Sequence, residues 1–79
     1  MEIKILGTGC AKCKTLEDAV RKTVAEMNMD ANITKVEDIM DIMEYGILRT
    51  PGLVIDDEVV ASGRMLSINE IKELINKKI

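Results

Sequence analysis

The spacing of apolar residues changes period several times along this chain, and each change predicts a different element. The stretch "EIKILG" alternates apolar and polar positions and runs into Gly7-Thr8-Gly9, which predicts a strand that leaves into a tight turn. After Ala11 the apolar positions follow the i, i+3, i+4 spacing of a helix that lies on a core: Leu16, Ala19, Val20, Thr23, Val24 and Met27. Asn28 tolerates a left-handed backbone and is the expected end of this helix, and "ANITKV" predicts a second strand.

The middle of the chain predicts a short helix followed by a hairpin. Asp38 can cap a helix that ends at Gly46 and whose inner face is Ile39, Ile42 and Met43. After Thr50-Pro51, the runs "GLVI" and "EVVA" flank Asp56-Asp57, a pattern that is typical of a β-hairpin.

The chain is predicted to end in a helix. Ser67 and Glu70 form a capping box ahead of the inner positions Ile68, Ile71, Leu74 and Ile75. The element order is therefore βαβαββα, which predicts an α/β fold with a four-stranded mixed sheet and three helices. Its first two strands are parallel and joined by a right-handed crossover. No linker or repeat divides the sequence, so residues 1–79 are expected to form a single domain.

Composition narrows the possible partners. With no Trp or Phe and one Tyr, the core must be aliphatic, and the six methionines, Met40 and Met43 among them, are expected to fill gaps in it. The net charge is −3 and no basic cluster exceeds Lys77-Lys78, so nucleic acid is not expected as a partner. No apolar run reaches the roughly 20 residues that span a bilayer, and "MEIKIL" is too short for a signal peptide. The expected location is the cytoplasm, where thiols are kept reduced.

The only two cysteines lie at the junction of the first strand and the first helix. Cys10 falls at the start of the helix and Cys13 one turn later, where their Cα atoms are expected to be about 5 to 5.5 Å apart, within reach of a disulfide. Free N–H groups and the helix dipole favour a thiolate there, and Lys12 is expected to lower the pKa of Cys10. We therefore predict that Cys10 is the attacking nucleophile and that Cys13 resolves the mixed disulfide.

Metal handling is the main alternative, because two thiolates also suit Cu(I), zinc or a shared iron–sulfur cluster. Heavy-metal-binding domains with a similar cysteine pair run βαββαβ and end in a strand, whereas residues 67–78 predict a helix. Structural zinc needs four ligands, and the chain has two thiols and no histidine. A structural pair is a weaker alternative, since so short a loop constrains the unfolded chain little.

Pro51 is the only proline and directly precedes a buried-looking strand. It is either a simple turn residue or a cis-proline that places its loop beside the cysteines and leaves the backbone of Thr50 free to pair with an extended substrate. Around Gly9, Ile47 and Thr50, a small apolar patch is a candidate surface for transient docking or dimerisation.

These features together resemble the thioredoxin/glutaredoxin superfamily: a Cys-x-x-Cys at a strand–helix junction, a lone Thr-Pro some forty residues later, then a hairpin and a final helix. More narrowly, "GTGCAKC", "TPGLVID" and "SGRMLSINEIKELI" resemble small thioredoxin-like redox-active disulfide proteins of archaea and bacteria. The resemblance implies a thioredoxin-like fold with Cys10 as nucleophile, Cys13 as resolving thiol and Pro51 as cis-proline.

The function that this resemblance implies is thiol–disulfide exchange without an organic cofactor. Its expected partners are disulfides of proteins or small molecules and a disulfide reductase, with no membrane, and the protein is expected to be a monomer or weak dimer. Thr50 and Pro51 would bind the substrate. No carboxylate can be assigned from the sequence to the buried proton-acceptor position that thioredoxins use behind the disulfide.

Overall fold

The computed structural model describes all residues from 1 to 79 and has the element order predicted from the sequence. Three helices alternate with four strands in the following order: β1 (Glu2–Leu6), α1 (Ala11–Glu26), β2 (Asn32–Val36), α2 (Ile39–Glu44), β3 (Gly52–Ile55), β4 (Glu58–Ser62) and α3 (Ile68–Asn76). None of these helices combines the length and the apolar character that crossing a bilayer requires.

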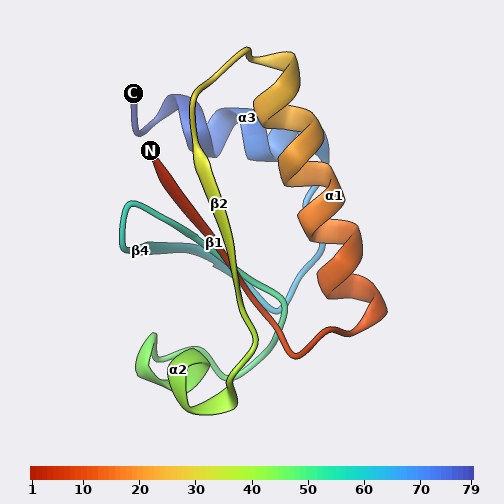
Figure 1. Cartoon of the computed structure of the whole chain (residues 1–79), viewed down its shortest axis with the longest axis vertical. Helices are drawn as coiled ribbons and strands as arrows, with labels where there is room; N and C mark the ends of the chain where they lie inside the picture. The colour runs from red at the N-terminus through yellow and green to blue at the C-terminus, as the bar shows by residue number, and fades with distance from the viewer.

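The four strands form one mixed sheet in the order β2-β1-β3-β4. As predicted, β1 and β2 are parallel and are joined through α1, while β3 and β4 form an antiparallel hairpin. The central pair, β1 and β3, is also antiparallel, with Leu6 opposite Gly52. In Figure 1, α1 and α3 lie at one side of the sheet, and α2 lies apart from them near the end where the loop from β1 leads into α1.

The larger core lies between the sheet and the pair α1 and α3. Alternate residues of β1 and β3 point to this face, and they pack against buried aliphatic side chains of the two helices. The cluster consists of Ile3, Ile5, Leu16, Val20, Val24, Leu53, Ile55, Leu66, Ile71 and Ile75. It contains no aromatic residue, in agreement with the predicted aliphatic core.

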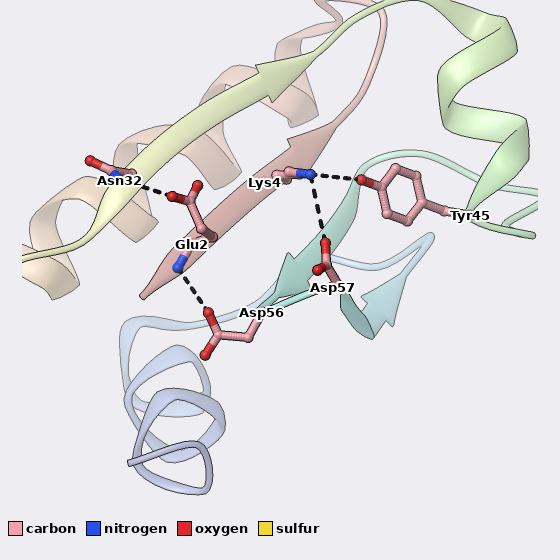
Figure 2. Close-up of polar contacts among 6 residues, drawn as sticks. All are labelled: Glu2, Lys4, Asn32, Tyr45, Asp56 and Asp57. Carbon is pink, nitrogen blue, oxygen red and sulfur yellow. Dashed lines mark hydrogen bonds and ion pairs between the residues drawn. The ribbon is translucent and has the colours of Figure 1, made fainter.

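The opposite face of the sheet carries a much smaller core under α2. Leu6, Ile42 and Val54 form a buried cluster there, with Tyr45 packed against it. Farther from α2 this face is polar. Figure 2 shows Lys4 of β1, whose Nζ donates a hydrogen bond to the Tyr45 hydroxyl at 3.1 Å and lies 3.7 Å from an Asp57 carboxylate oxygen.

Local sequence signals account for the ends of several elements. The Asp38 carboxylate accepts a hydrogen bond from the Met40 N–H, and Ser67 and Glu70 form the reciprocal capping box. Asp56 and Asp57 have φ values of 48° and 66°, the left-handed backbone that a two-residue hairpin turn requires.

The predicted inner face of α2 is only partly correct. Ile42 is buried, but Ile39 and Met43 are 54 % and 63 % exposed, and Met40, expected to fill the core, is 68 % exposed. A helix of six residues that covers one end of a sheet can turn only one residue in three or four toward it. Most of the apolar surface of α2 therefore faces outward.

Candidate active site

Three connections meet at one end of the sheet. Leu6 is the last residue of β1 and is paired with Val36 at the end of β2 and with Gly52 at the start of β3. Three segments therefore lie at this end of the sheet: the one that leads to Cys10, the one that enters α2 and the one that ends at Pro51. The Gly7 N–H continues the ladder by donating to the Val36 carbonyl at 2.9 Å.

Cys10 and Cys13 are joined by a disulfide, with their Cα atoms 5.1 Å apart as predicted. Cys10 is the N-cap residue of α1 and is exposed, whereas Cys13 lies in the first turn and is only 5 % exposed. The Cys10 Sγ accepts a hydrogen bond from the Cys13 N–H at 3.3 Å. Donation from a helix N-terminus stabilises negative charge, so this position favours the thiolate of Cys10 once the disulfide is reduced.

Gly7 allows the chain to pass close to the buried sulfur. A Cβ at this position would overlap the Cys13 Sγ and lie 2.9 Å from the Cys13 Cβ. Gly9 has a φ of +90° and turns the backbone toward the start of α1. The two glycines of the sequence "GTG" thus have separate structural roles: Gly7 makes room for Cys13, and Gly9 permits the turn.

A charged cluster beside Cys13 was not predicted from the sequence. Glu17, Lys35 and Glu37 line the same small hollow as Cys13. The side chain of Glu17 is 15 % exposed; it accepts a hydrogen bond from the Arg21 Nε at 3.0 Å and lies 3.6 Å from the Lys35 Nζ. The hydrogen bond from Arg21 is the main reason why the pKa of Glu17 is lowered, so this carboxyl stays ionised at neutral pH.

The spacing of Glu17 gave one signal that could have revealed this cluster. Glu17 follows Cys13 by four residues and so lies on the same face of α1. Lys35 and Glu37 come from the end of β2 and the turn after it, and only the crossover connection brings them beside α1.

Thr50 and Pro51 directly precede β3, at the same end of the sheet from which the segment that leads to Cys10 leaves. The Thr50–Pro51 peptide bond is cis, the Pro51 side chain is buried, and the Pro51 carbonyl accepts a hydrogen bond from the Gly63 N–H at 2.9 Å. Neither the N–H nor the carbonyl of Thr50 forms a hydrogen bond within the chain.

Lys12 lies in the first turn of α1, between the two cysteines, and is exposed. Its ammonium group forms no ion pair and no hydrogen bond within the chain. The predicted influence on Cys10 would therefore act through space alone.

The element order does not match that of the metal-binding alternative. The chain ends in α3 and not in the strand of a heavy-metal-binding domain. An exposed sulfur bonded to a buried one at a helix N-terminus is instead suited to thiol–disulfide exchange, because an incoming thiolate or disulfide can reach only the exposed atom.

Comparisons with known proteins agree with this geometry. The Thioredoxin domain family matches residues 1–76. A thioredoxin of Methanothermobacter thermautotrophicus is 41 % identical over 76 residues, which is 96 % of this chain and 99 % of that relative. A thioredoxin of Methanocaldococcus jannaschii is 45 % identical over 71 residues, which is 90 % of this chain and 81 % of the relative.

A solved structure supports the same fold. Thioredoxin 1 from Thermosipho africanus superposes with a TM-score of 0.64 at 17 % identity, covering 99 % of this chain and 93 % of the other. The fold class predicted from the sequence is confirmed by this likeness. With a Cys-x-x-Cys disulfide at the N-terminus of α1 and close similarity to two thioredoxins over nearly its whole length, the chain belongs to the thioredoxin family of thiol–disulfide oxidoreductases.

Proposed function

We propose that this protein transfers two electrons to disulfides of proteins or small molecules through Cys10 and Cys13. The observation that carries the proposal is the asymmetry of the pair: Cys10 is exposed and caps α1, and Cys13 is buried behind it. The exposed sulfur is the one that an external disulfide can reach. The buried sulfur can react only with Cys10, which is the task of a resolving thiol.

The reaction proceeds by two exchanges. The Cys10 thiolate attacks one sulfur of the substrate disulfide, forms a mixed disulfide and releases the other substrate sulfur as a thiolate that takes up a proton. Cys13 then loses its proton and attacks the Cys10 sulfur, so that the Cys10–Cys13 disulfide forms and the second substrate thiol leaves. A disulfide reductase supplies two electrons to restore the dithiol, which fits a protein that works in the reducing cytoplasm.

Thr50 and Pro51 are the proposed substrate-binding residues. Thr50, whose N–H and carbonyl are unpaired, precedes β3 at the end of the sheet from which the cysteine segment also leaves. An extended substrate segment that pairs with Thr50 would gain backbone hydrogen bonds, because Thr50 lies beyond the paired residues of β3. This would hold the substrate disulfide next to Cys10.

The test is reduction of a small neutral disulfide, bis(2-hydroxyethyl) disulfide, and of a disulfide-containing protein by the reduced enzyme. Cys10→Ser should abolish both reactions, because the only other thiol, that of Cys13, is buried. Cys13→Ser should react once and accumulate a mixed disulfide at Cys10, detectable as a mass increase that dithiothreitol reverses. Full turnover by Cys10→Ser would refute the proposal.

The role of Lys12 is tested by the thiolate absorbance of the reduced protein during a pH titration. Lys12→Glu replaces a positive by a negative charge next to Cys10 and should move the Cys10 titration to higher pH. Lys22→Glu makes the same change on an exposed position farther along α1 and serves as the control. Identical titrations of both variants would remove Lys12 from the proposed site.

A further inference from the structure

The largest exposed apolar residues gather on α2 and the segment after it. Ile39, Met40 and Met43 of α2 are each more than half exposed, and Leu48, in the segment that returns to β3, is 99 % exposed. We call these four residues the α2 surface. Contiguous apolar side chains on the outside of a small protein are typical of an interaction site, and methionine adapts its shape to different partners.

Three residues of the α2 surface, Ile39, Met43 and Leu48, line a cleft that Thr50 also lines. The cleft has a volume of about 340 Å³ and runs between α2 and residues 46–50. Thr50, one of the lining residues, has no hydrogen-bond partner for its backbone within the chain. The other backbone groups of residues 47–49 likewise form no hydrogen bond within the chain. A segment bound at Thr50 would thus continue directly into the apolar cleft.

The charge on α2 and the residues that flank it is predominantly negative, although Lys4 of β1 lines a hollow together with Asp41 and Glu44. Residues 37–45 contain four carboxylates and no Lys or Arg: Glu37, Asp38, Asp41 and Glu44. Asp41 and Glu44 form no ion pair within the chain, and Glu37 is 4.0 Å from the Lys35 Nζ. The single cation that lines the cleft is Arg49, next to Thr50. A bound segment that crosses α2 therefore meets apolar side chains first and carboxylates beyond them.

A second copy of this chain is a poor occupant of the α2 surface. In a symmetric dimer the same patch is present on both subunits, so in each copy the carboxylates outnumber Arg49, the single cation that lines the cleft. Like charges placed opposite one another disfavour association. A partner with positive charge around an apolar segment has the complementary pattern.

We propose that the α2 surface selects its substrate proteins, by binding a segment next to the substrate disulfide that carries apolar side chains flanked by Lys or Arg. This inference rests on the proposed disulfide-reducing function and names the class of substrate. The apolar side chains occupy the cleft beside Ile39, Met43 and Leu48, and the basic side chains reach Asp41 and Glu44. Opposite charges at the rim of an interface mainly raise the association rate, so the selection appears in kcat/KM.

The experiment compares three synthetic peptides that contain the same intramolecular disulfide and differ only in the adjoining segment. One segment is apolar with lysines, the second is apolar with glutamates, and the third has serines in place of the apolar residues and keeps the lysines. Their reduction by the reduced protein is followed by acid quenching and chromatography at low and at high salt. The small neutral disulfide bis(2-hydroxyethyl) disulfide measures the chemistry without docking.

Two variants with matched controls locate the effect on the α2 surface. Glu44→Lys reverses a charge in the last turn of α2, where a cation is compatible with the helix dipole. Glu73→Lys makes the same change at an exposed position of α3. Leu48→Ser removes an apolar side chain that packs on nothing, and Ile79→Ser removes another exposed one at the end of the chain.

We expect the apolar basic peptide to be reduced fastest, with an advantage over the acidic peptide that shrinks at high salt. Glu44→Lys should lower kcat/KM for the basic peptide about fivefold, and Leu48→Ser should lower it by a similar factor of about five. The two control variants should leave it unchanged, and all four should reduce the small disulfide at the normal rate.

The results separate the two proposals. Equal rates for all three peptides, or equal effects of the α2 variants and their controls, would overturn the docking proposal while disulfide reduction stands. Failure of the unmodified protein to reduce even the small disulfide would overturn the proposed function itself.

Discussion

The two faces of the sheet differ in how completely they are covered. On one face, α1 and α3 bury a continuous aliphatic cluster that includes Ile3, Val20 and Ile71, each with no exposed surface. On the other face, the short α2 buries only Leu6, Ile42 and Val54 and leaves its own Met40 and Met43 outside. The first face therefore stabilises the fold, and the second has apolar surface left for other molecules. The cysteines lie at the start of α1, the helix that covers the first face.

The strongest way to test this difference is to remove a side chain from the covered face. Ile71→Ala in α3 deletes a fully buried side chain and should lower the free energy of unfolding by about 2–5 kcal/mol, because the cavity cannot close completely. Urea unfolding followed by circular dichroism measures the change. A loss below about 1 kcal/mol would mean that α3 packs much less tightly than the structure indicates.

A smaller effect on stability is expected at Gly7, which follows β1 and lies against Cys13. Gly7→Ala places a methyl group on the buried Cys13 sulfur and should lower the free energy of unfolding of the oxidised protein by about 1–3 kcal/mol. The exposed neighbour provides the control, since Thr8→Ala should change little. Equal unfolding curves for the two variants would show that the close approach at Gly7 is easily relieved.

The capping box of α3, one of the helices of the covered face, should make a modest, pH-dependent contribution to the free energy of unfolding. The hydrogen bond from Arg64 is the main reason why the pKa of Glu70 is lowered from its ordinary value of 4.5, and a bond from Ser67 adds to it. A carboxyl with a lowered pKa stabilises the folded state above its unfolded pKa, and this contribution is lost as the pH falls through the folded pKa. The stability difference between the protein and Glu70→Gln should therefore be present at pH 7 and shrink toward pH 3.

Thermal unfolding at several pH values measures this difference. A gap between the two proteins that stays constant down to pH 3 would mean that the charge of Glu70 plays no part in stability. Glu73→Gln on the same helix serves as the control, since its side chain forms no ion pair.

The smallest effect on stability is expected on the open face. Met40→Ala removes a side chain that is 68 % exposed and should change the free energy of unfolding by no more than about 0.5 kcal/mol. Urea unfolding run beside Ile71→Ala gives the direct comparison of the two faces. A loss as large as that of Ile71→Ala would show that α2 contributes to the core after all.

The sequence predicts well those features that depend on near neighbours. Three such features are present, and each needs only a few adjacent residues. They are the helix cap at Asp38, the capping box of Ser67 and Glu70, and the left-handed turn at Asp56 and Asp57. The position of Cys10 at a helix start follows in the same way from the change of period after "EIKILG". These signals are strong because the hydrogen bonds that produce them are local.

Features that depend on distant segments were missed. Helical spacing identifies Ile39, Ile42 and Met43 as one stripe, but whether a stripe is covered depends on how far the helix extends over the sheet, and α2 covers only the end. The cluster of Glu17 with Lys35 likewise forms only when the crossover connection brings β2 beside α1. No pattern within a short window contains that information.

The lone aromatic residue has a practical consequence for spectroscopy. Tyr45 follows α2 and is hydrogen-bonded to Lys4, and the chain contains no Trp. All intrinsic ultraviolet fluorescence of the protein therefore originates from one position on the open face of the sheet. Binding of a ligand to α2 can be followed by the Tyr45 emission without an attached dye. Binding to the covered face should change this emission very little.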